Sequence, residues 1–310
     1  MTEQPTVASE EAIRYLRSLA SVPLWEQTPA GRRQEMRREC SAGGGRPPQM
    51  ASVVDVDAFG VPARLYRPTG SERGLLVWMH GGAWMFGDLD CADAVVRTIA
   101  IAAGCSVLSV DYRLVPEHRF PAAIEDCWAA LQWAGQETDL LAIGGDSSGG
   151  NLAAATAILA RDAAIDLRLQ LLVYPVLDYR VDSPSYDDFS DRYSEFCGIE
   201  AYGRARVDAI RYIWEEYVPD PSLRTDERAS PLRTRSFANL APAFIVTAEH
   251  DILSAEAEDF ADRLRAAGVE VVLVNYAHEV HGFFPLVGTF PAARDAASRC
   301  AQALRRVFAR

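Results

Sequence analysis

Apolar segments of two kinds alternate along most of this chain. Short, unbroken apolar runs are typical of buried strands, whereas longer stretches with apolar residues on one side are typical of helices. The predicted strands lie at residues 75–79, 106–110, 140–143, 169–174, 243–247 and 271–276. The predicted helices lie at residues 92–103, 122–133, 151–160, 256–267 and 292–308. Because strands and helices alternate, we expect an α/β fold with a mostly parallel sheet that helices cover on both faces.

The residues before the first of these strands follow a different pattern. Ser9 can cap a helix with apolar residues on one face, and a highly charged helix is expected at 31–40. The loop at 43–48 is rich in glycine and proline and marks the first natural boundary. We therefore expect residues 1–45 to be a segment that packs on the rest of the protein. Two short strands that follow, at 53–58 and 63–67, are expected to form a hairpin.

A second interruption covers residues 178–240, where the alternation of strands and helices stops. It divides the α/β core into two parts, 46–177 and 241–310. Aromatic residues are dense between Tyr179 and Tyr217, far above their 9% share of the whole chain. This density fits an apolar lid over a pocket and equally fits a small core of the insertion itself.

Length, composition and charge limit the partners of the protein. The chain has 310 residues, of which 49% are hydrophobic, enough for one large domain with a full core. It has 31 basic and 43 acidic residues, so its net charge is −12. An acidic protein repels nucleic acids and anionic membrane surfaces, so we expect neither as a partner. The most apolar stretch, 98–110, is too short to span a bilayer.

The six cysteines are scattered and form no C-x-x-C pair, which argues against zinc-ribbon and thioredoxin-like sites. We therefore expect no metal. The N-terminus lacks the basic and apolar regions of a secretion signal. Free thiols in a cytoplasmic protein are the expectation.

The strongest chemical signal is the glycine-rich segment between the predicted strand at 140–143 and the helix at 151–160. Gly145 to Gly149 match the pattern G-x-S-x-G, with Ser147 at its centre, in the strand–turn–helix context that a nucleophile elbow requires. Glycines flank the serine because side chains would collide in so sharp a turn. The pattern also occurs by chance in ordinary turns, so it needs support from other residues.

A serine hydroxyl needs a base, and the chain has five histidines. Reactive groups gather beyond the carboxyl ends of parallel strands. His281 fits this rule best, because it follows the strand at 271–276 by a short loop. His278 is the second choice. The alternative is that His281 is an ordinary histidine of a surface loop.

The base needs an acid that holds its tautomer. Asp251 directly follows a predicted strand, which places it at the same edge of the sheet as Ser147 and His281. The chain order of serine, aspartate and histidine is the one expected for an α/β-hydrolase. Glu249 and Asp259 are competitors, and a capping role at the surface is the alternative for Asp251.

Attack on an ester carbonyl places negative charge on its oxygen, which needs hydrogen-bond donors. The stretch after the strand at 75–79 offers backbone N–H groups with little side-chain obstruction. Gly81 and Gly82 are the predicted donors, with the N–H of Ser148 as a third. His80 is expected to fix this loop.

Four segments together resemble the hormone-sensitive-lipase-like branch of the α/β-hydrolases. They are H-G-G-A-W at 80–84, D-Y-R-L-V-P-E-H-R-F-P-A-A-I-E-D at 111–126, G-D-S-S-G-G-N at 145–151 and H-G-F at 281–283. The similarity covers roughly residues 50–305. It implies the α/β-hydrolase fold with a helical cap, formed by the N-terminal segment and the insertion at 178–240. It also implies carboxylesterase activity on small esters with short acyl chains, without a cofactor.

The resemblance further implies a Ser147–Asp251–His281 triad and the oxyanion hole described above, with the segment at 111–126 bracing the catalytic loops. The chain departs from the family where Ser148 replaces the usual alanine and Ala83 replaces a third glycine.

The substrate-binding residues are expected among aromatic side chains of the lid and of the loop after the first core strand. We assign Tyr186, Trp214, Trp84 and Phe86 to this role, although the last two fit a plain core role equally well. Relatives of this branch include dehydratases, cyclases and small-molecule receptors, which often lose a triad residue. The complete triad therefore favours a hydrolase. The last strand and helix can form a homodimer interface, as in some relatives.

Overall fold

The computed structural model describes residues 8–19, 24–70, 73–181, 186 and 202–309. In these residues a single sheet has the strand order β1-β2-β4-β3-β5-β6-β7-β8. Its strands are β1 (Ser52–Asp57), β2 (Pro62–Arg67), β3 (Leu75–Met79), β4 (Ser106–Val110), β5 (Leu141–Asp146), β6 (Leu167–Val173), β7 (Ala243–His250) and β8 (Val271–Val280). The pairs β1–β2 and β2–β4 are antiparallel, and all later pairs are parallel. The structure thus confirms the mostly parallel sheet and the predicted hairpin.

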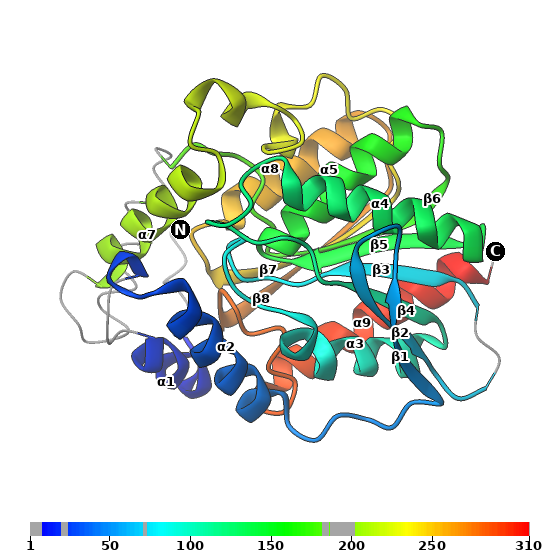
Figure 1. Ribbon diagram of the computed structural model, residues 1–310, viewed down its shortest axis with the longest axis horizontal. Coiled ribbons are helices and arrows are strands. Elements are labelled where there is room, and N and C mark those ends of the chain that lie inside the picture. Colours follow the sequence, from blue (N-terminus) through cyan, green and yellow to red (C-terminus); the bar gives the residue numbers. More distant parts are fainter. Residues whose placement is uncertain (1–7, 20–23, 71–72, 182–185, 187–201, 310) are drawn as a thin grey trace, which may run out of the picture.

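Helices cover both faces of the sheet, as expected (Figure 1). The helices α3 (Leu89–Ala103) and α9 (Pro291–Phe308) lie on one face and pack against each other. The other face carries α4 (Ala122–Glu137), α5 (Ser148–Asp162) and α8 (Ser254–Ala266). The strands between these layers are almost wholly buried, because all residues of β3, β4 and β5 lie in the core.

Several strands continue past their predicted ends. The strand predicted at 140–143 reaches Asp146, because Gly144 and Gly145 pair with β3 on one side and β6 on the other. Sheet pairing therefore outweighs the weak strand preference of glycine. The strand β8 continues beyond residue 276 to Val280, where it still pairs with His250 of β7. His281 therefore follows β8 directly, not after the short loop expected.

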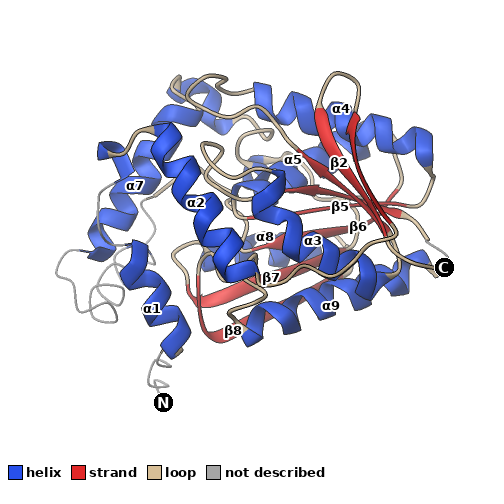
Figure 2. Ribbon diagram, turned by 60° about the horizontal axis from the view of Figure 1, so that its bottom comes forward, coloured by secondary structure: helices blue, strands red, loops and turns tan. Residues whose placement is uncertain are grey.

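The remaining helices gather at one end of the molecule, as both ribbon views show (Figures 1 and 2). They are α1 (Glu10–Leu19), α2 (Pro29–Gly44) and α7 (Tyr202–Tyr217). The short turn η1 (Leu24–Glu26) lies between α1 and α2, and the turns η2 (Pro221–Thr225) and η3 (Pro231–Arg233) follow α7. The hydroxyl of Ser9 accepts a hydrogen bond from the N–H of Ala12, which confirms the predicted cap of the first helix. The backbone N–H of Ser9 donates to the carbonyl of His278, which joins the N-terminal segment to β8.

The helix α2 is fastened to the core by Arg33. Its guanidinium donates to the carbonyls of Met85 and Val115 and to the carboxylate of Glu117. Among the described residues, no helix combines the length and apolar character needed to cross a membrane.

Candidate active site

Ser147 lies in a strained turn between β5 and α5. Its φ angle of 55° falls in the left-handed region that non-glycine residues rarely adopt. A Cβ atom on Gly145 would lie 2.3 Å from the carbonyl oxygen of Gly149. A Cβ atom on Gly149 would lie 2.1 Å from the carbonyl oxygen of Met79. Only glycine fits on either side, so the local sequence forces a sharp elbow that presents the serine hydroxyl.

Three side chains from distant parts of the chain meet at this elbow. Ser147 Oγ lies 2.8 Å from His281 Nε2. On the other side of the imidazole ring, His281 Nδ1 lies 2.7 Å from Asp251 Oδ2. The carboxylate of Asp251 is completely buried, whereas the side chain of His281 is 17% exposed. The structure therefore brings together the hydroxyl, imidazole and carboxylate that the sequence singled out.

The competing residues lie elsewhere. His278 is an exposed residue of β8. Glu249 accepts a hydrogen bond of 2.6 Å from Asn275, and Asp259 pairs with Arg263 along α8.

Both partners of the serine are held by neighbouring groups. Asp251 Oδ1 accepts the N–H of Leu253 at 3.0 Å, which leaves Oδ2 for the histidine. The ring of Tyr174 packs against the imidazole of His281 with 4.6 Å between centroids, and its hydroxyl accepts the N–H of Phe284. Sequence reasoning missed this role of Tyr174, although its position at the carboxyl end of a predicted strand was a usable signal.

In the loop after β3, one of the two backbone amides predicted to bind the oxyanion is already engaged. The N–H of Gly81 donates to Asp146 Oδ1 at 3.0 Å, so it is already engaged. This contact argues against Gly81 as an oxyanion donor. The N–H groups of Gly82 and Ala83 have no hydrogen-bond partner among the described residues. Ser148 is the first residue of α5, so its N–H has no acceptor inside the helix.

Asp146 is a second residue that sequence reasoning missed. Its carboxylate is buried, and burial raises its pKa to about 6, although the hydrogen bond from Gly81 lowers it. A Cβ atom on Gly81 would lie 2.4 Å from Asp146 Oδ2, so this carboxylate needs a glycine beside it. Its position inside the G-x-S-x-G motif was the available signal.

His80 has the contacts of a residue that shapes this loop. Its Nδ1 lies 2.8 Å from the carbonyl oxygen of Gly81, and its ring stacks on Tyr112 with 4.4 Å between centroids. Burial lowers the pKa of the imidazole, which favours the neutral ring. The backbone N–H of Val115 donates to the carbonyl of Trp84, which joins the segment at 111–126 to the same loop.

The aromatic side chains assigned to substrate binding are all buried. The ring of Trp84 stacks on Tyr217 of α7 with 4.0 Å between centroids and lies 5.3 Å from the ring of Trp214. Phe86 lies under the guanidinium of Arg32, which is 5.8 Å from the ring centroid. These contacts join the loop after β3 to α2 and α7. The fourth residue, Tyr186, is buried and donates its hydroxyl to Glu256.

No cluster of three or more His, Cys, Asp or Glu side chains that could hold a metal ion occurs in the described part of the chain.

Comparison with known proteins gives a family for this geometry. Residues 76–285 match the family described as alpha/beta hydrolase fold. Carboxylesterase NlhH of Mycobacterium tuberculosis is 38% identical over 262 residues, covering 80% of this chain and 79% of that protein. The ethyl acetate hydrolase of Pseudomonas putida is 32% identical over 267 residues, covering 82% and 81%. A solved ester hydrolase from the metagenome of Lake Arreo has a TM-score of 0.87 at 32% identity, and the match covers 98% of this chain and 100% of that one.

The chain belongs to the α/β-hydrolase fold family, in its hormone-sensitive-lipase-like branch. It is a carboxylic ester hydrolase, as the sequence motifs predicted.

Proposed function

We propose that the protein is a serine carboxylesterase that hydrolyses small esters with short acyl chains through Ser147, His281 and Asp251. Ser147 Oγ attacks the carbonyl carbon while His281 Nε2 takes its proton. Asp251 keeps the proton on His281 Nδ1 and stabilises the imidazolium. When the tetrahedral intermediate collapses, His281 donates its proton to the leaving alcohol. Water then attacks the acyl-enzyme by the same route and releases the acid.

The oxyanion of each intermediate is stabilised by backbone N–H groups of Gly82, Ala83 and Ser148 in this proposal. Their availability supports the assignment, because the Gly81 amide is engaged by Asp146. A single donor of this kind contributes about 2.7–4 kcal/mol of transition-state stabilisation.

The observation that carries the proposal is the continuous hydrogen-bonded line from Ser147 Oγ through the His281 ring to Asp251. The preference for short acyl chains is supported by the similarity to a protein named ethyl acetate hydrolase. The reaction needs no cofactor.

We assign residues 1–45 and 178–240 to a cap over the core formed by 46–177 and 241–310. The position of α1, α2 and α7 at one end of the molecule supports this division (Figure 2). Tyr186, Trp214, Trp84 and Phe86 shape the substrate pocket in this proposal. A cytoplasmic location and a homodimer stay predictions.

The test is hydrolysis of p-nitrophenyl acetate, butyrate, octanoate and palmitate by the wild-type protein and by Ser147→Ala. We expect activity to be highest on the two short esters and to fall by at least about 10⁴-fold in the variant. Activity that survives the substitution would contradict a serine mechanism and favour a dehydratase or cyclase that uses only the oxyanion hole. Absence of turnover with tight binding of a small molecule would favour a receptor.

A further inference from the structure

Glu256 is a buried acid that the proposed reaction does not use. It lies in the first turn of α8, shortly after Asp251. Only 8% of its surface is exposed, and burial raises its pKa to about 7. Such a group is costly to bury unless its oxygen atoms accept hydrogen bonds.

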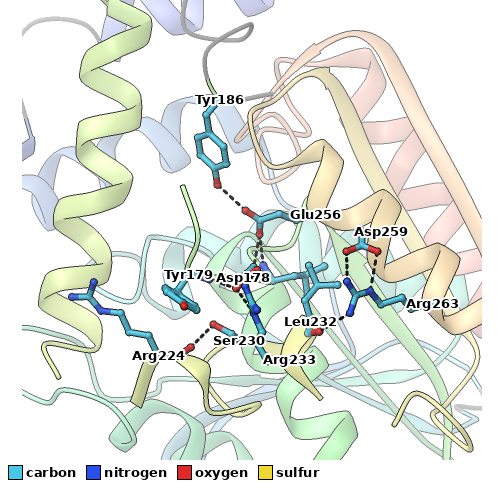
Figure 3. A network of polar contacts seen from close by, with 11 residues as sticks. Asp178, Tyr179, Tyr186, Arg224, Ser230, Leu232, Arg233, Glu256, Asp259 and Arg263 are labelled. Carbon is cyan, nitrogen blue, oxygen red and sulfur yellow. Dashed lines mark hydrogen bonds and ion pairs between the residues drawn. The ribbon is translucent and has the colours of Figure 1, made fainter. Parts of the chain in front are cut away.

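Three donors from two other segments converge on this carboxylate (Figure 3). Glu256 Oε2 accepts the backbone N–H groups of Leu177 at 2.7 Å and Asp178 at 2.9 Å. Glu256 Oε1 accepts the hydroxyl of Tyr186 at 2.7 Å. Both oxygen atoms are therefore occupied, each by a different part of the chain.

The first of these segments is the turn that follows β6, and it also supports the nucleophile. The N–H of Val176 donates to the carbonyl of Ser147 at 3.3 Å, and Asn151 Nδ2 donates to the carbonyl of Val176 at 2.9 Å. Glu256 thus holds the backbone of Leu177 and Asp178 in a turn whose preceding residue, Val176, is bonded to the backbone of Ser147.

The second segment is the insertion at 178–240, represented by Tyr186. The side chain of Tyr186 is 2% exposed, and its hydroxyl points at Glu256 in the close view (Figure 3). Burial raises the pKa of Tyr186, and the carboxylates of Glu256, Asp251 and Asp178 raise it further. The phenol therefore keeps its proton and acts as a donor close to the catalytic acid.

The charged groups around this contact are otherwise satisfied. Asp178 forms two hydrogen bonds, of 2.9 and 2.6 Å, with the guanidinium of Arg233. On α8 itself, Asp259 pairs with Arg263. Neither arginine pairs with Glu256 among the described contacts, so its partners are the neutral donors.

We propose that Glu256 is a positioning residue that seats the cap insertion over the active site through Tyr186, and that this contact helps to determine which ester sizes the enzyme accepts. This inference rests on the proposed esterase function. The two oxygen atoms have separate tasks: Oε1 holds the cap, and Oε2 holds the turn beside Ser147.

Variants separate the two tasks. Tyr186→Phe removes only the bond to Oε1. Glu256→Leu removes both sets of bonds and leaves two backbone N–H groups without an acceptor. Glu256→Gln keeps a carbonyl oxygen for those N–H groups and an amide N–H that can donate to the Tyr186 oxygen. Glu258→Gln is the matched control, because Glu258 is an exposed acid on the same helix.

We measure kcat and KM on p-nitrophenyl acetate and octanoate. Tyr186→Phe is expected to change the ratio of the two KM values by at least about fivefold, the effect of one hydrogen bond. Glu256→Leu should change the KM ratio equally and also lower kcat by about tenfold or more. Glu256→Gln and Glu258→Gln should stay within about twofold of wild type. The double variant Tyr186→Phe/Glu256→Leu should have the KM ratio of Glu256→Leu alone.

An unchanged KM ratio in Tyr186→Phe, or additive effects in the double variant, would overturn the proposal. Hydrogen exchange of the peptide that contains Tyr186 gives a readout independent of catalysis. Faster exchange in Tyr186→Phe and Glu256→Leu than in wild type supports the seating role, and unchanged exchange overturns it. If the wild-type protein hydrolyses no ester, the proposed function fails, and the exchange measurement still decides whether Glu256 seats the insertion.

Discussion

The rim of the sheet, where Asp251 meets His281, and the base of the proposed cap, where Glu256 meets Tyr186, each contain a buried carboxylate. Asp251 lies in the loop before α8 and Glu256 in the first turn of that helix, but the two acids are used differently. Asp251 at the rim has an ionisable partner, His281, and its geometry suits keeping a proton on Nδ1 and stabilising the imidazolium. Glu256 at the cap base has neutral donors, and its geometry suits holding segments in place. Closeness in the chain therefore does not decide the role of a buried acid. The partners that the fold brings to it do.

This difference predicts that rim substitutions change kcat and leave stability intact. Substitutions at the cap base change stability or KM, and they lower kcat only where, as in Glu256→Leu, they also free the turn beside Ser147. The following variants test that separation.

The largest effect is expected for Asp251→Asn. The amide no longer holds the proton on His281 Nδ1, so the tautomer that accepts the serine proton is lost. We expect kcat to fall by about 10⁴-fold with an unchanged melting temperature. Steady-state kinetics and thermal unfolding check both points. Asp259→Asn, on the surface of α8, which follows Asp251 in the chain, is the control and should leave kcat unaffected.

Trp214→Ala comes next and acts on the cap. Trp214 is 2% exposed and packs near Trp84 and Tyr217, so its removal leaves a cavity. We expect the free energy of unfolding to fall by about 3–5 kcal/mol. Denaturant unfolding measures this, with Trp25→Ala as control because Trp25 is 43% exposed. A collapse of kcat without loss of stability would break the separation between the regions.

Asp146→Ala tests how the oxyanion loop is held. Without the carboxylate the Gly81 amide loses its acceptor, and the neighbouring amides of Gly82 and Ala83 lose their fixed direction. We expect kcat to fall by about 10²–10³-fold, as for the loss of one oxyanion donor. Asp146→Asn keeps an oxygen that can accept the Gly81 N–H and should retain most of the activity. Equal losses in both variants would show that charge, not loop position, matters at Asp146.

The smallest effect is a pH dependence of stability that comes from Glu256. Its pKa is raised by burial from 4.5 to about 7, so between these values the folded protein holds a proton that the unfolded chain releases. The free energy of unfolding therefore falls as pH rises through this window, by about 3 kcal/mol for this group. Glu256→Gln removes the titration, so its stability relative to wild type should rise by that amount between pH 4 and pH 8. A constant difference between the two proteins across this range would contradict the prediction.

The sequence by itself determined the features that depend on residues close together in the chain. The elbow at Ser147 is one, because glycines beside it are the only residues that fit the turn. The alternation of apolar runs determined the parallel sheet. The rule that carboxyl ends of strands share an edge favoured Asp251 and His281, with His278, Glu249 and Asp259 as alternatives.

Only the tertiary structure decided contacts between segments far apart in the chain. The Gly81 amide donates to Asp146, which lies 65 residues further along the chain. Because of this bond, we propose Ala83 in place of Gly81 as an oxyanion donor. The bond from Tyr186 to Glu256 spans 70 residues, and Trp84 meets Trp214 only where α7 packs against the loop after β3. Each of these side chains has many possible partners in sequence. The choice is made by the packing of whole elements, which local preference does not encode.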